Sequence, residues 1–196
     1  MKKIELPITQ TVSATFKFSS EGIFENDIAD MMNEEIQEKM HIARENGGKI
    51  LYAATSIEQE LERFLMTYFM GPFHEPDERR NLFENELLKS TMLSFSDKKS
   101  LFLKVLNSKS FIKGKEKDQL TTQLKSIMDW RNAFAHGKVQ HNTEKGCSLK
   151  YYSGNHTEQV LDDKFWDTVI SIFESCKQLL KKSQENMSKK LYSPEN

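Results

Sequence analysis

The residues Met128-Asp129-Trp130-Arg131-Asn132-Ala133-Phe134-Ala135-His136-Gly137 end an amphipathic helix that the sequence predicts from about Asp118 to His136. Apolar residues on this helix recur at a spacing of three and four, and Arg131 falls on the same face. These apolar residues are Leu120, Leu124, Ile127 and Phe134. Because an arginine keeps its charge, burial on such a face requires a carboxylate, a carbonyl or an anionic ligand beside it.

The end of this helix combines three kinds of polar group. Gly137 directly follows His136 and predicts a left-handed helix stop. His136 then lies in the last turn, where the helix dipole favours a positive charge, and Asn132 lies one turn earlier on the same flank. The sequence therefore brings a permanent cation, a carboxamide and an imidazole to one helix terminus.

Arg131-Asn132, three further residues and His136, with Ala135 before the histidine and Gly137 after it, resemble the signature of HEPN domains (higher eukaryote and prokaryote nucleotide-binding). The resemblance covers roughly residues 49 to 184. It implies a mainly α fold, namely a four-helix up-down bundle with extra short helices and a small antiparallel β-sheet or hairpin. In catalytic members of the family, two protomers bring their motifs together at a dimer interface and cut RNA without a metal.

The function implied by this resemblance is a homodimeric RNA endonuclease of the toxin or antiviral-defence kind. Arg131 and His136 would be essential and Asn132 would assist, with no cofactor and no metal. RNA is the implied substrate, and a cognate antitoxin protein is an implied further partner. Lys138 and His141 come just after the motif and are candidates for substrate contact. Because mannitol-operon-repressor-like relatives are treated as regulators, a non-catalytic regulatory or protein-interaction module is the alternative.

Glu58 interrupts the apolar arc of another predicted helix, Lys49 to Met70, which Gly71-Pro72 ends. We expect this acid to meet Arg131, within one protomer or across a dimer, with Glu60 as the second candidate. Such a pair could support catalysis, or it could simply be a satisfied buried salt bridge. The sequence leaves both interpretations open.

The length of 196 residues suits one domain with a proper core. We divide it into an N-terminal strand segment (1–20), a helical bundle (24–184) with a hairpin at 138–153, and a frayed tail (185–196). Alternating residues 4 to 18 predict one or two strands that could pair with the hairpin. The remaining predicted helices run from about Ile28 to Asn46-Gly47-Gly48, from Arg79 to Lys89, from Asp97 to Leu106 with Ser96 as the cap, and onward from the cap Asp162-Asp163.

Composition limits the possible settings of the protein. A net charge of -1 gives no overall attraction to nucleic acid or membrane, and no window is apolar enough to span a bilayer. Two cysteines do not suggest a disulfide framework, which fits a cytoplasmic protein. The spacing of His136, His141, Cys147 and His156 matches no zinc site.

Overall fold

The computed structural model describes residues 1–6, 34–72, 77–142 and 145–192. These residues are mainly helical, as predicted, and they include a small antiparallel sheet. Contacts divide the chain into two compact units. The first holds Met1–Ala53 and Trp130–Ser171, and the second holds Ala54–Asp129 and Ile172–Asn196. None of the helices in the described ranges is apolar enough over a sufficient length to cross a membrane.

The long helix α2 (Glu34–Met70) is continuous through Gly47 and Gly48, where the sequence predicted a break. The Phe134 ring packs directly against the backbone of Gly47, because a Cβ atom at this position would lie only 2.5 Å from Cδ1 of Phe134. The helix ends as predicted at Gly71, which has a positive φ of 85°. The predicted start of a helix near Ile28 lies outside the described residues.

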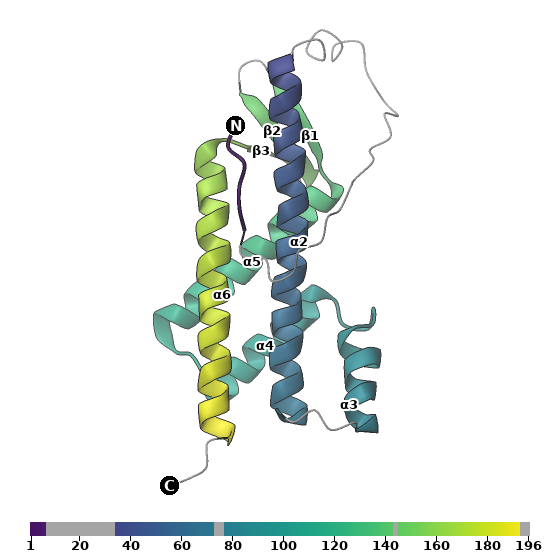
Figure 1. Cartoon of the computed structure of the whole chain (residues 1–196), viewed down its shortest axis with the longest axis vertical. Coiled ribbons are helices and arrows are strands. Elements are labelled where there is room, and N and C mark those ends of the chain that lie inside the picture. The colour runs from purple at the N-terminus through teal and green to yellow at the C-terminus, as the bar shows by residue number, and fades with distance from the viewer. Residues whose placement is uncertain (7–33, 73–76, 143–144, 193–196) are drawn as a thin grey trace. The chain divides into compact units, whose positions relative to one another are not determined.

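The N-terminal segment of the first unit, Met1 to Leu6, lies along α2 (Figure 1). The buried side chain of Asn46 holds it, because its Oδ1 accepts from the Ile4 amide at 3.1 Å and its Nδ2 donates to the Lys2 carbonyl at 3.0 Å. Ile4 and Leu6 are buried. Asn46, predicted to end a helix, thus satisfies backbone groups of another segment.

The sheet also belongs to the first unit. Strands β1 (Lys138–Asn142) and β2 (Gly146–Tyr152) form the predicted hairpin, with Lys138 opposite Lys150. The third strand, β3 (His156–Val160), pairs with β2 and was not predicted. We expected the N-terminal segment in its place, but residues 1–6 form no strand and residues 7–18 lie outside the described ranges.

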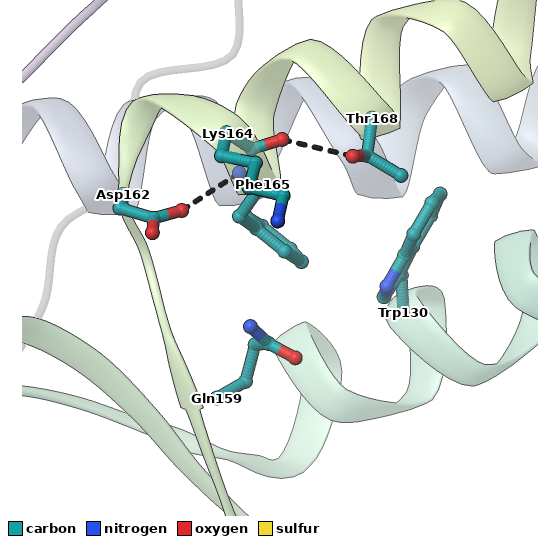
Figure 2. A pocket seen from close by; sticks show the side chains of 6 residues that line it. All are labelled: Trp130, Gln159, Asp162, Lys164, Phe165 and Thr168. Atoms are coloured by element: carbon teal, nitrogen blue, oxygen red, sulfur yellow. Dashed lines mark hydrogen bonds between the residues drawn. The ribbon is translucent and has the colours of Figure 1, made fainter.

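Helix α6 (Asp163–Tyr192) follows the sheet. Asp162 caps it as predicted, because its Oδ1 accepts from the amide of Phe165 at 2.7 Å (Figure 2). The tail predicted to fray continues this helix to Tyr192, and Met187 is fully buried. In the second unit, the Asn186 side chain donates to the Phe111 carbonyl at 2.8 Å, which helps to hold the last turns.

The rest of the second unit is formed by shorter elements. They are α3 (Glu78–Leu82), the π-helix η2 (Phe83–Leu88), α4 (Phe95–Lys109) and most of α5 (Gly114–His136). Helix α4 begins at Ser94 and not at the predicted Ser96, because Ser94 and Asp97 form a reciprocal capping box. Phe102, Leu106, Leu120 and Leu124 are fully buried in this unit.

Candidate functional site

The last turns of α5 belong to the first unit, and their packing differs from the predicted seam. Leu120, Leu124 and Ile127 are buried as predicted, but the buried residue in the last turns is Ala133, which is 3% exposed. Arg131 is only half-buried. The expectation that its guanidinium is sealed on an apolar face is therefore wrong.

Aromatic contacts explain this change of face. The Phe134 ring covers Gly47 of α2 and lies 6.1 Å, centroid to centroid, from Trp166 of α6. Trp130 meets Phe165 edge to face at 5.9 Å. These contacts fix the rotation of the helix end. Trp130, Ala133 and Phe134 are three and four residues apart and share the packed face, so Arg131 lies at the edge of this face.

The structure places Arg131, Asn132 and His136 together at this accessible helix end. Asn132 and His136 are exposed, and the Nη1 of Arg131 donates to Oδ1 of Asn132 at 3.2 Å. Within its own unit, no described carboxylate forms an ion pair with Arg131. The guanidinium thus keeps most of its donors for another partner.

Gly137 joins the helix end to the sheet, but not through the predicted left-handed stop, since its φ is not positive. A Cβ atom at Gly137 would lie 2.3 Å from the Ala133 carbonyl oxygen and 2.9 Å from that of Lys150. Only a glycine permits β2 to approach so closely. This approach sets His136 beside the hairpin.

The hairpin adds positive charge to this helix end. Lys138 and Lys150 are exposed cross-strand partners, and like charges in such positions repel one another. Among the described residues of this unit, neither lysine forms an ion pair. Sequence reasoning missed Lys150, although counting back from the predicted turn would have paired it with Lys138.

Glu158, the other cross-strand neighbour of Lys150, forms its hydrogen bonds and its ion pair with other residues. Its carboxylate accepts from the Ser148 hydroxyl at 2.9 Å and pairs with Lys145 at 3.2 Å. These two interactions lower the pKa of Glu158, and the nearby charge of Lys150 contributes less. We call Arg131, Asn132, His136, Lys138 and Lys150 the helix-end cluster.

His141 does not join this cluster. It is three residues from Lys138 on β1, so the two side chains lie on opposite faces of the hairpin. His141 is half-buried opposite Cys147, and its Nδ1 has no hydrogen-bond partner in the described part of the chain. The structure thus separates two residues that the sequence placed together as candidates for substrate contact.

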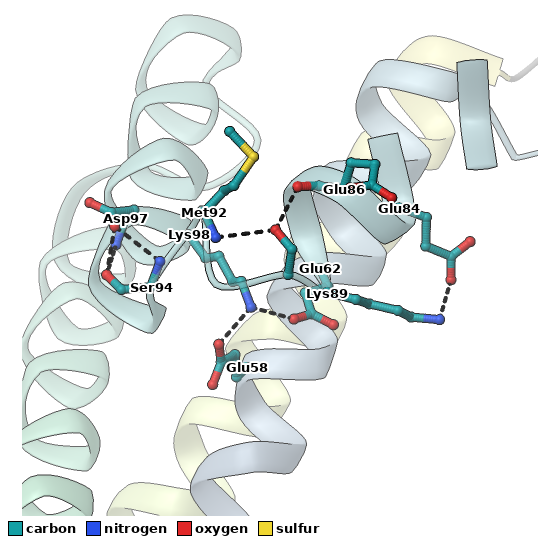
Figure 3. Close-up of polar contacts among 10 residues, drawn as sticks. Glu58, Glu62, Glu84, Glu86, Lys89, Met92, Ser94, Asp97 and Lys98 are labelled. Carbon is teal, nitrogen blue, oxygen red and sulfur yellow. Dashed lines mark hydrogen bonds and ion pairs between the residues drawn. The ribbon is translucent and has the colours of Figure 1, made fainter. Parts of the chain in front are cut away.

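Glu58 has a different partner from the predicted one. Its carboxylate accepts from Nζ of Lys98 at 2.6 Å, and Glu62 accepts from the same ammonium at 2.5 Å (Figure 3). The side chain of Lys98 is only 5% exposed, so it requires these carboxylates. The predicted pairing of Glu58 with Arg131 in one protomer is therefore corrected to Lys98, and the second candidate, Glu60, pairs with Arg63.

Other chemistries find less support in the described residues. No group of three or more histidines, cysteines or acids there is arranged to hold a metal ion. Both cysteines are buried, and burial raises the pKa of Cys176 to about 12, which keeps it a thiol at neutral pH.

Comparison of the chain with family models, curated proteins and solved structures finds no match.

Proposed function

We propose that this protein is a metal-independent RNA endonuclease of the toxin or defence type, in which two copies join their helix-end clusters into one site. The observation that carries the proposal is the accessibility of Arg131, Asn132 and His136 on one helix end whose buried residue is Ala133. The resemblance of these residues to the HEPN signature supports the same function.

The proposed reaction is an attack of a ribose 2′-hydroxyl on the adjacent phosphorus. The proton of this hydroxyl passes to the imidazole of one His136, and the new O–P bond forms as the bond to the 5′-oxygen breaks. The leaving 5′-oxygen takes a proton from a second, protonated imidazole. The products are a 2′,3′-cyclic phosphate and a 5′-hydroxyl, so neither water nor a redox partner is consumed in this step.

The other residues of the helix-end cluster would stabilise the charge that develops on phosphorus. The planar guanidinium of Arg131 matches two phosphate oxygens, and the carboxamide of Asn132 fixes its orientation. Lys138 and Lys150 would attract the RNA backbone, which would relieve their mutual repulsion. Each chain supplies one motif histidine, so a symmetric homodimer would provide both acid and base.

The test is cleavage of mixed single-stranded RNA in the presence of a chelator. We expect the His136→Ala variant to lose activity by about 100-fold or more, since general acid–base groups contribute at least that much. His156→Ala is the matched control, because His156 is an exposed histidine on β3 of the same unit. The products should carry 2′,3′-cyclic phosphate ends, which mass spectrometry identifies.

Two results would contradict the proposal. One is cleavage that the chelator abolishes, and the other is cleavage to which His136 and His156 contribute equally. If wild-type protein cleaves no RNA, a non-catalytic regulatory or protein-interaction module becomes the better account of the same fold.

A further inference from the structure

A small pocket opens in the first unit where the end of α5, β3 and the start of α6 meet. It is lined by Trp130, Gln159, Asp162, Lys164, Phe165 and Thr168 (Figure 2). Its volume of about 310 Å³ is at the lower limit of ligand-binding pockets. This volume suits one aromatic ring system better than a peptide or a large cofactor.

Two aromatic side chains border the pocket. Phe165 is buried and supports Trp130, whose ring it meets at an interplanar angle of 80°. Trp130 is only half-buried, so part of its indole surface reaches the pocket. Unpaired nucleobases stack on aromatic side chains of this kind, whatever the base.

The polar groups of the pocket suit the edge of a base. Figure 2 shows the carboxamide of Gln159 pointing into the space beside Phe165 and Trp130. Its Nε2 donates to the Val160 carbonyl at 2.8 Å, and its Oε1 accepts no hydrogen bond from the described residues. A carboxamide offers both a donor and an acceptor, as the edges of nucleobases do.

The charges at the pocket favour a neutral group over a phosphate. Asp162 lines it, and only one of its carboxylate oxygens is shown to cap α6. A phosphate placed there would be repelled by this carboxylate, whereas an amino group of a base could donate to it. Lys164 lies at the same pocket and could contact the strand beside the bound base.

The pocket also lies close to the helix-end cluster. Trp130 directly precedes Arg131 on α5, and His136 is six residues further on, about 9 Å along the helix axis. This axial distance is a minimum for the separation of the two side chains, and at about 3.4 Å per nucleotide, the spacing along one strand of duplex DNA, it corresponds to at least three nucleotides. One strand could therefore occupy both places.

We propose that the pocket of Trp130, Gln159 and Phe165 binds one unpaired base of the RNA strand whose phosphate lies at the helix-end cluster. This inference rests on the proposed function for the identity of its ligand. The pocket would position the strand and stack a base, and the helix-end cluster would carry the chemistry.

The experiment uses the intrinsic fluorescence of the wild-type protein, whose only tryptophans are Trp130 and the fully buried Trp166. The probe is a single-stranded 2′-O-methyl RNA of mixed sequence, which lacks the attacking hydroxyl and cannot be cleaved by the proposed reaction. We expect it to quench the fluorescence. A strand of the same length with abasic sites should bind at least about fivefold more weakly, because one stacked base is worth that factor or more.

Three variants distinguish RNA binding at the pocket from RNA binding elsewhere on the surface. Trp130→Phe should remove the quenching and leave the emission of Trp166. Gln159→Leu should weaken binding of the base-containing strand several-fold, whereas Gln178→Leu, at an exposed position of α6, should not. Equal affinity for base-containing and abasic strands would overturn the inference, as would equal binding by the two leucine variants.

The two proposals fail in different ways. Quenching that depends on the bases, without cleavage of ordinary RNA, would support the base-binding pocket and contradict the proposed ribonuclease activity. Cleavage that requires His136, together with RNA binding that does not depend on the bases, would support the ribonuclease activity and contradict the base-binding pocket. The abasic strand needs no variant, so the test does not depend on the folding of Gln159→Leu.

Discussion

Gly47 and Phe134 pack so closely that any side chain at residue 47 would strike the phenylalanine ring. An added Cβ atom would lie 2.5 Å from Cδ1 and 3.0 Å from Cε1 of Phe134. This contact joins the middle of α2 to the helix end that carries Arg131, Asn132 and His136. It therefore fixes which residues of α5 face outward.

We expect Gly47→Ala to destabilise the protein by about 1–3 kcal/mol, the usual cost of an overpacked core. Within a helix, the same change is ordinarily favourable by about 1 kcal/mol, so the expected sign is opposite to helix propensity. Urea unfolding measures the effect. In a Phe134→Leu background the clash is smaller, and Gly47→Ala should then cost less. Equal costs in both backgrounds would show that the two residues do not interact.

The buried ammonium of Lys98 gives a second prediction. Burial alone would lower the pKa of Lys98, but its hydrogen bonds to Glu58 and Glu62 outweigh burial and raise the pKa above 10.5. Lys98→Met should cost about 3–5 kcal/mol at neutral pH, because it leaves two partly buried carboxylates without their cation. Lys99→Met, at the neighbouring half-exposed position, should cost far less.

The contribution of Lys98 and its two carboxylate partners to stability should depend on pH in a definite direction. The pKa of Lys98 is higher in the folded protein than the value of 10.5 expected in the unfolded chain. The protonated ammonium therefore stabilises the folded protein fully below pH 10.5, and this stabilisation is lost as the pH rises through the pKa of the folded state. The difference in unfolding free energy between wild type and Lys98→Met should thus be constant from pH 7 to pH 9 and shrink above about pH 10.5. A difference that grows with alkalinity would contradict the assignment.

The start of α4 gives a third prediction, because two serines compete for the role of cap. The Ser94 hydroxyl accepts from the Asp97 amide at 3.2 Å, and Asp97 accepts from the Ser94 amide at 3.0 Å. Ser94→Ala should therefore cost about 1 kcal/mol, whereas Ser96→Ala should change the unfolding free energy by less than about 0.5 kcal/mol. Denaturant unfolding of the two variants at neutral pH compares them directly, and a larger loss for Ser96→Ala would contradict the capping box.

The same cap should weaken in acid. Hydrogen bonds from the side chain and the amide of Ser94 lower the pKa of Asp97 below 3.8. A lowered pKa gives stabilisation that is present above 3.8 and is lost as the pH falls through the folded value. The difference between Ser94→Ala and wild type should accordingly narrow below about pH 4, and a difference independent of pH down to 3 would contradict this role of Asp97.

Periodicity predicted the helical class, the hairpin, the end of α2 at Gly71 and the cap at Asp162. It failed at Gly47, because a pair of glycines normally ends a helix, and a ring from a residue 87 positions away explains this exception. The cap of α4 was missed because Ser94 and Ser96 both precede the predicted start of this helix at Asp97. Only the reciprocal bond with Asp97 distinguishes them.

The sequence predicted which residues form the candidate site, but it did not predict how they pack or which residues contact them. The motif placed Arg131, Asn132 and His136 at one helix end, where the structure also has them. The same periodicity wrongly buried Arg131, because the last turns of α5 follow the aromatic contacts of Trp130 and Phe134. We predicted that Glu58 pairs with Arg131 because each interrupts an apolar face of its helix. Periodicity did not reveal that Lys98 is buried beside Glu58.

The most direct test of the composite site mixes wild-type subunits with His136→Ala subunits in varied proportions, lets them exchange, and measures RNA cleavage in chelator. If one site needs the imidazoles of two copies, activity falls as the square of the wild-type fraction, so an equal mixture keeps about a quarter of the activity. Activity that falls in simple proportion, to about a half in the equal mixture, would show that each copy acts alone and would contradict the shared site.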